Sequence, residues 1–306
     1  MITLLRKLVF RRAPACFLGA AVLSGLTFIL GGSPSGEGLT VMTFNIRLDA
    51  PADGLNAWPN RKDLVIRTIL FHKAEVVGAQ EALNGQVADL EAGLPGYVRV
   101  GVGRDDGAAA GEFNPIFFLK ERFECLRHST FWLSATPDHP GSRGWDAACN
   151  RIVTWAELYD RRTGTTLFAF NTHFDHIGET ARRESAALLL RRLAALAGAA
   201  PVLVTGDFNC AMEDEPYRLL TAGVQGGPPL ADSRTLSSSA PYGGRSSFNG
   251  FRPDTGRGAI IDFIFVRPGT RVVRAGVIAE KWDGRFASDH YPVLAEVDLG
   301  AAAPGR

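Results

Sequence analysis

The sequence predicts an α/β protein with a single domain over about residues 38–299. Short apolar or β-branched runs recur along the chain and end in polar residues, a pattern typical of buried strands. Longer segments with apolar residues at helical spacing separate several of these runs. A chain of 306 residues can bury a large core. Because no composition break and no repeat of fixed period interrupts the pattern, we expect one domain rather than two.

The predicted elements alternate along this domain. Strands are expected at residues 40–47, 76–80, 97–103, 116–120, 123–128, 151–159, 166–173, 201–209, 259–266, 270–279 and 291–299. Helices are expected at residues 61–72, 86–94 and 179–197, where apolar residues fall on one face. Long polar or Gly-rich loops are expected at residues 49–60, 104–112, 131–148 and 225–257. Loops of such length inside a compact domain are often functional.

Residues 1–32 have the pattern of a targeting segment. Four cations among the first twelve residues precede an uncharged stretch, residues 13–30. That stretch is long for a signal peptide and short for a spanning helix, so a cleaved signal and a membrane anchor both stay open. Residues 33–37 are expected to be a linker and residues 300–306 a tail. We expect the protein to be exported, periplasmic or secreted, or else attached to the membrane through residues 13–30.

The charge balance disfavours a general nucleic-acid binder. The formal net charge is +1, and removing four N-terminal cations from the 33 basic residues leaves 29 against 32 acidic ones. Such a body lacks a broad positive surface for a phosphate backbone. The four cysteines form no C-x-x-C pair, which argues against a thiolate zinc site, while a Cys125–Cys149 disulfide stays open.

Polar residues at the strand ends suggest a catalytic site. Asp207 and Asn209 stand two apart after a buried run, so both side chains face the same side of an extended backbone. Each such residue alone fits an ordinary turn. Carboxylates and histidines are seldom buried unless they are paired or bind metal, so their recurrence favours a shared site. The other residues at predicted strand ends are Asn45, Glu81, His173, Asp262, Asp289 and His290.

These residue types suit metal-assisted attack of water on a phosphate ester. Asn45 and Glu81 offer oxygen ligands, which Mg²⁺ or Mn²⁺ prefer. Histidine–aspartate pairs can move protons near neutral pH. Asn209 can donate a hydrogen bond to a developing negative charge. No G-x-S-x-G sequence is present, so an acyl-transfer hydrolase is disfavoured.

Six short motifs, in chain order, resemble those of the endonuclease/exonuclease/phosphatase superfamily, and in particular its exported bacterial members. The motifs lie at residues 43–47, 80–81, 171–173, 206–209, 261–263 and 288–290. The resemblance implies the deoxyribonuclease-I-like fold, a four-layered α/β sandwich in which helices flank two packed mixed β-sheets. It also implies a divalent-metal-dependent phosphoesterase that contains Mg²⁺ or Mn²⁺.

The same resemblance assigns roles to individual residues. Glu81 would be the principal metal ligand, with Asn45 beside it. The catalytic residues would be His173, Asp207, Asn209, Asp262, Asp289 and His290. Asp207 would orient or deprotonate the attacking water, and His290, paired with Asp262, would contact the phosphate.

Two arginines complete the assignment. Arg151 would give a further substrate contact, although a solvated charge explains it equally well. Some nuclease branches have an acid at the position of Arg47, so a second metal carboxylate there is in doubt.

The resemblance does not choose the substrate, because one site of this kind serves many phosphate esters. A phosphorylated small molecule, a lipid headgroup and a nucleotide stay open, and we expect a monomer. One alternative is an extracellular nuclease of the same superfamily, and another is a non-catalytic binding module. Five loop aromatics could stack on a base or sugar, or instead close the core; they are Trp58, Trp132, Trp145, Phe248 and Phe251.

Overall fold

The computed structural model describes residues 38–252 and 258–300, and its strands form two six-stranded sheets. The first sheet contains β1 (Leu39–Asn45), β2 (Val76–Gln80), β3 (Tyr97–Val100), β4 (Ile116–Leu119), β11 (Arg271–Val277) and β12 (Val293–Asp298). Its order is β11-β12-β1-β2-β4-β3. The second sheet contains β5 (Phe123–Trp132), β6 (Ile152–Asp160), β7 (Thr165–His173), β8 (Val202–Asp207), β9 (Ala231–Asp232) and β10 (Asp262–Val266). Its order is β5-β6-β7-β8-β10-β9.

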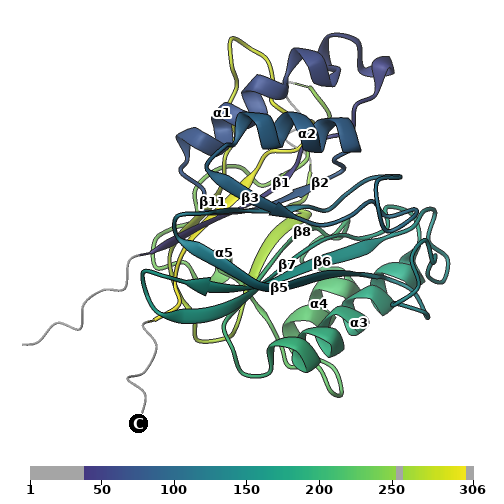
Figure 1. Ribbon diagram of the computed structural model, residues 1–306, viewed down its shortest axis with the longest axis vertical. Helices are drawn as coiled ribbons and strands as arrows, with labels where there is room; N and C mark the ends of the chain where they lie inside the picture. Colours follow the sequence, from purple (N-terminus) through teal and green to yellow (C-terminus); the bar gives the residue numbers. More distant parts are fainter. Residues whose placement is uncertain (1–37, 253–257, 301–306) are drawn as a thin grey trace, which may run out of the picture. The chain divides into compact units, whose positions relative to one another are not determined.

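Helices cover the outer face of each sheet (Figure 1). Helices α1 (Lys62–Phe71) and α2 (Asn84–Gly93) pack on the first sheet, and α3 (Glu179–Ala197) and α4 (Glu215–Ala222) lie against the second. The short elements are η1 (Pro51–Asn56), η2 (Trp58–Asn60) and α5 (Ser233–Leu236). Within the described ranges, no helix has the length and apolar character needed to cross a bilayer. The expected four-layered α/β sandwich is confirmed.

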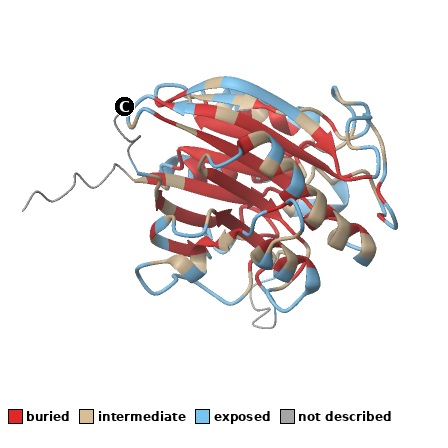
Figure 2. Cartoon of the chain, turned by 90° about the horizontal axis from the view of Figure 1, so that it is seen from below, coloured by how far each residue is buried: buried red, intermediate tan, exposed pale blue. Residues whose placement is uncertain are grey.

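Strand β1 shows how two cores are built from one apolar run. Val41 faces the larger core between the sheets, whereas Met42 and Phe44 face the smaller core beneath α1 and α2. Neighbouring side chains of a strand point to opposite faces, so a strand covered on both sides must be apolar throughout. Figure 2 shows this burial along the inner strands of both sheets.

The pairing register brings the polar strand ends to one edge of the sandwich. Strands β1 and β2 run parallel, with Asn45 opposite Gln80, so Glu81 follows directly beside Asn45. Strands β7 and β8 also run parallel, with His173 opposite Asp207. The antiparallel strand β10 places Asp262 opposite Asp207 from the other side. Residues far apart in sequence therefore meet at the carboxyl ends of the parallel pairs.

The structure corrects several predicted boundaries. Residues 131–148 were expected to be a loop, but β5 continues to Trp132, because Phe131 and Trp132 pair with β6 and are buried. Residues 225–257 were also expected to be a loop, yet β9 pairs with β10 and α5 follows at once. Helix α4 was not predicted. The predicted segments 1–32 and 33–37 lie outside the described residues, as does the predicted tail 300–306 except for Gly300.

The cysteines are not cross-linked in the described part of the chain. Cys125, Cys149 and Cys210 are all free thiols, so the disulfide left open above is not formed. Cys210 is buried, which raises the pKa of its thiol to about 12. Such a thiol is unreactive at neutral pH.

Candidate active site

Two carboxylates at the strand ends are held together by Asn45. The Asn45 Nδ2 atom donates to Glu81 Oε1 at 2.9 Å and to Asp207 Oδ2 at 3.0 Å. Its Oδ1 atom accepts from the Arg47 backbone N–H at 3.0 Å. Glu81 also accepts from the Leu48 N–H at 3.1 Å. Asn45 thus fixes the carboxylates of two different sheets, and its predicted role as a metal ligand stays a prediction.

His173 lies beside these carboxylates as a neutral ring. Its Nε2 atom is 3.0 Å from Asn209 Nδ2, which is a donor, so Nε2 accepts. Burial, reinforced by the charge of Arg151, holds the pKa of His173 well below its ordinary value. The same Nε2 atom lies 3.4 Å from Asp207 Oδ2. The Nε2 atom of His173 therefore lies between the Asn209 amide and the Asp207 carboxylate.

Glu81, His173 and Asp207 fit a divalent cation. Each offers one ligand atom, and these atoms all lie within 4.8 Å of one another. The two carboxylates offer the oxygen ligands that Mg²⁺ and Mn²⁺ prefer, whereas the imidazole nitrogen is a less usual ligand for Mg²⁺. Burial, and then the charge of Asp262, raises the pKa of Asp207 to about 7. A bound cation would relieve this cost, because it favours the ionised carboxylate.

His290 carries a proton at the opposite side of Asp207. Its Nδ1 atom lies 2.9 Å from Asp262 Oδ2, and its Nε2 atom lies 3.7 Å from Asp207 Oδ2. Burial alone would lower the pKa of His290, but the charges of Asp262 and Asp207 outweigh it and hold the pKa well above its ordinary value. The predicted Asp262–His290 pair is present. It presents a buried N–H donor to the cleft.

Asp289 and Arg47 border the cleft beside this pair. Burial raises the pKa of Asp289, whose Oδ2 atom lies 3.9 Å from Arg47 Nε. Arg47 also bonds Asp53 through Nε and Nη2, at 3.0 and 3.1 Å. The position where some nucleases have an acid thus carries a paired guanidinium.

Three residues of the site have a left-handed backbone. Arg47, Glu81 and Asn209 have φ values of 56°, 64° and 46°, which are uncommon for residues other than glycine. All three stand just after a strand, where the chain must turn and present a side chain to the same edge. Conformations of this kind persist where the surrounding structure holds them, and they cluster at functional sites.

Arg151 is buried and held by two neighbours that sequence reasoning missed. It is only 4% exposed, so the solvated alternative is wrong. Its Nε atom bonds Asp175 Oδ2 at 3.2 Å, and its Nη2 atom bonds His176 Nδ1 at 2.9 Å. Its Nη1 atom is buried with no hydrogen-bond partner.

These groups surround one cleft of about 400 Å³. Seven of the nine predicted residues line it, while Asn45 and Asp262 bond to the residues that do. The lining residues not predicted are Leu48, Arg104, Glu112, Cys149 and His176. His176 was within reach of prediction, since it follows His173 closely. No local pattern marks Arg104 or Glu112, which stand in a loop expected to be exposed.

The loop aromatics divide into two groups. Trp58 and Trp132 are buried and close the core. Trp145 is 39% exposed and Phe248 is 44% exposed. Phe248 lines the cleft and packs edge-on against His290, with ring centroids 5.0 Å apart. Phe251 instead contacts the Arg61 guanidinium, 5.7 Å from its ring centroid.

Comparison with known proteins agrees with the fold. The model of the Endonuclease/Exonuclease/phosphatase family matches residues 42–290. An endonuclease/exonuclease/phosphatase of Bacteroides vulgatus is 43% identical, with a TM-score of 0.82 over 86% of this chain and 99% of that one. The mannosyl-6-phosphatase of Bacteroides thetaiotaomicron is 35% identical, with a TM-score of 0.79 over 85% and 99%.

A viral protein is also similar. An uncharacterised protein of Acanthamoeba polyphaga mimivirus is 30% identical over 167 residues, which span 50% of this chain and 59% of the viral one. The family match covers most of the chain and includes every motif that forms the cleft. The chain therefore belongs to the endonuclease/exonuclease/phosphatase family.

Proposed function

We propose that the protein is a divalent-metal-dependent phosphatase that hydrolyses the phosphate monoester of a small molecule. The observation that carries this proposal is the composition of the cleft. Ligand atoms of Glu81, His173 and Asp207 lie within 4.8 Å of one another. The protonated His290 stands beside them, 3.7 Å from Asp207. A cation site next to a buried N–H donor can bind a phosphate ester and stabilise the charge that develops when its P–O bond breaks.

The chain's own residues supply the proton handling. Asp207 would accept a proton from the attacking water, because its carboxylate lines the cleft beside Glu81 and His173. His290 would donate its Nε2–H to a phosphate oxygen, while Asp262 holds the other ring nitrogen at 2.9 Å. Asn209 would donate a further hydrogen bond. When bound, a divalent cation at Glu81 would neutralise charge on the phosphate.

The small size of the cleft favours a monoester of a small molecule over a polymer. Its volume of about 400 Å³ lies near the lower end of ordinary small-molecule sites. The mannosyl-6-phosphatase relative, whose name describes a phosphate monoester substrate, covers 85% of this chain at 35% identity. The nuclease alternative requires a cationic track for a backbone, and the body of the chain carries more acids than bases. The binding-module alternative requires loss of a catalytic residue, and every residue assigned a catalytic role is present in the sequence.

A metal-dependence assay tests the proposal. Phenyl phosphate, a phenyl phosphodiester and a DNA oligonucleotide are each incubated with the full-length protein, with Mg²⁺, with Mn²⁺ or with a chelator. We expect metal-dependent release of inorganic phosphate from the monoester, and a loss of at least ~10²-fold in Glu81→Ala and His290→Ala. Faster cleavage of the oligonucleotide would favour the nuclease. No turnover of any ester would favour the binding module.

A further inference from the structure

One end of the cleft lies beyond the groups assigned to the phosphate. Along the edge of the second sheet, Arg151 precedes β6, His173 ends β7 and Asp207 ends β8. Arg151 is thus two strands away from Asp207, about 10 Å at the usual strand spacing. The first sheet is arranged in a similar way. Glu81 stands at the end of β2, and the connection between β3 and β4 lies on the side of β2 away from β1.

The β3–β4 connection faces Arg151 with an ion pair. Arg104 Nη1 lies 2.7 Å from Glu112 Oε2, and both side chains line the cleft. The loop between them is fixed by its own backbone, since Arg104 N–H donates to the Glu112 carbonyl at 3.1 Å. The Asp106 carboxylate also accepts from two backbone N–H groups of this loop, at 2.8 and 2.9 Å. We call Arg104, Glu112 and Arg151 the distal subsite.

Counted together with Asp175, which pairs with Arg151, the charges of the distal subsite cancel. Arg104 is paired with Glu112, and Arg151 is paired with Asp175 at 3.2 Å. Each guanidinium still has a buried nitrogen with no hydrogen-bond partner, Nε of Arg104 and Nη1 of Arg151. Buried donors of this kind are costly unless something accepts from them. A binding surface with donors, a carboxylate acceptor and no net charge suits neutral hydroxyl groups better than a second anion.

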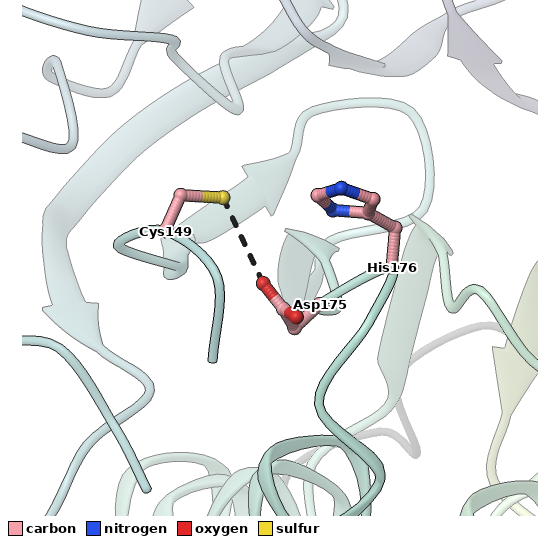
Figure 3. A group of neighbouring side chains, drawn as sticks. All are labelled: Cys149, Asp175 and His176. Carbon is pink, nitrogen blue, oxygen red and sulfur yellow. Dashed lines mark hydrogen bonds between the residues drawn. The ribbon is translucent and has the colours of Figure 1, made fainter. Parts of the chain in front are cut away.

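The neighbouring cluster Cys149, Asp175 and His176 does not compete as a metal site (Figure 3). Its three side chains lie close enough to hold an ion. However, the Arg151 guanidinium already bonds both Asp175 and His176 and takes the place that a cation would need. Asp175 Oδ1 also accepts from two backbone N–H groups, at 3.0 and 2.8 Å. The cluster holds Arg151 in position.

We propose that the distal subsite binds the hydroxyl groups of a sugar whose phosphate lies at the Glu81–His290 end. This inference rests on the proposed phosphatase function and names its substrate class. A hexose ring attached to the phosphate would extend over roughly the distance of two strands. Hydroxyl oxygens would accept from Arg104 and Arg151, and a hydroxyl hydrogen would be donated to Glu112.

The preference for a sugar phosphate over a phosphate without hydroxyl groups, measured as a ratio of two kcat/KM values, tests this proposal. The kcat/KM for a hexose 6-phosphate is divided by the kcat/KM for phenyl phosphate, which has no hydroxyl groups. We expect the wild-type protein to prefer the hexose ester, and Glu112→Gln and Arg104→Lys to lower the ratio by about 10-fold or more, the usual effect of losing a hydrogen bond to a charged group. Arg104→Lys keeps the positive charge while removing Nε and the forked donors of the guanidinium. Glu91→Gln, in the Arg99–Glu91 pair outside the cleft, is the matched control and should leave the ratio unchanged.

The outcomes separate the two proposals. Equal rates on both substrates in the wild type, or equal losses on both in the variants, would overturn the distal subsite while leaving the phosphatase in place. Stronger competitive inhibition by a hexose bisphosphate than by the monophosphate would also overturn it, because it would reveal net positive charge. Absence of metal-dependent hydrolysis of phenyl phosphate would overturn the phosphatase itself.

Discussion

Two buried groups of charged side chains link the sheets, at opposite ends of the strands. At the catalytic end, Glu81, Asp207, Asp262 and Asp289 gather near the single protonated ring of His290. At the other end, Arg122 is 1% exposed and bonds both Asp160 and Glu75, each at 2.7 Å.

The second group is balanced and the first is not. Arg162, whose side chain is 40% exposed, also bonds Glu75 at 3.0 Å and lies 3.7 Å from Glu121 at the surface, so each buried acid beside Arg122 has an arginine partner. At the catalytic end the acids are in excess, and Asp262 Oδ1 has no hydrogen-bond partner. A balanced buried group holds the fold together without a ligand, whereas an acid excess favours binding of a cation. Predictions that separate the two ends follow from this difference.

The largest expected effect is on catalysis at the acid-rich end. Asp207→Asn should lower kcat/KM by ~10²–10⁴-fold, the range for a general base. It should not destabilise the metal-free protein. Burial raises the pKa of Asp207 from its ordinary value to about 7, so stability is lost as the pH rises between those two values, and the full cost of the ionised carboxylate is present above pH 7. Urea unfolding at pH 8 should show the variant at least as stable as the wild type; a clear loss of stability would contradict the comparison.

The balanced end should respond in the opposite way. Arg122→Met leaves Glu75 and Asp160 without their shared partner and should lower the free energy of unfolding by about 3–5 kcal/mol. The kcat of the protein that remains folded should stay near the wild-type value. Arg127→Met is the matched control, because Arg127 is 60% exposed in its pair with Glu157 and such pairs contribute less than about 1 kcal/mol. Equal losses in both variants would show that burial of Arg122 is not decisive.

A divalent cation should stabilise the folded protein only by binding at the acid-rich end. A cation that binds the folded protein alone, at about 100 times its Kd, stabilises it by about 2.7 kcal/mol. We expect Mg²⁺ or Mn²⁺ to raise the melting temperature of the wild type, measured by calorimetry, and not that of Glu81→Gln. Glu75→Gln should melt lower but keep the shift. A metal shift that survives in Glu81→Gln would place the cation elsewhere.

The smallest effect concerns the proton of His290. Asp262 helps to hold the pKa of His290 above its ordinary value, so Asp262→Asn should lower that pKa. Activity that requires protonated His290 should then fall at lower pH, moving the alkaline limb of the kcat/KM profile down by about 1 unit or more. An alkaline limb that stays in place would assign it to another group.

Local sequence patterns predicted the polar residues at the strand ends well. They predicted poorly the cleft residues that come from the connections between strands. Asp207 and Asn209 follow a run of buried β-branched residues, so their position could be inferred without knowing any partner. Arg104 and Glu112 reach the cleft only because β3 and β4 pair beside β2, which no local pattern reveals. Asp175 and His176 stand in a polar turn, where a solvated side chain is the usual outcome.

The separation in sequence between pairing strands explains the other differences between the predicted and the observed elements. Strand β9 has only two residues and forms because β10, about thirty residues later, pairs with it. A contact of that kind overrides the loop composition of residues 225–257. The excess of acids at the acid-rich end could not be inferred from the sequence either, because its acidic residues come from both sheets.

The neighbours of β1 determine when the cleft can be completed during synthesis. Strand β1 pairs with β12, so the earliest and latest described strands lie side by side. All strands of the second sheet leave the ribosome before β11 and β12, and that sheet can assemble while the chain is still growing. His290 arrives only with β12. A nascent chain released before that point would contain Glu81, His173 and Asp207 and yet lack His290, so the cleft would be incomplete until the residues that precede β12 have been made.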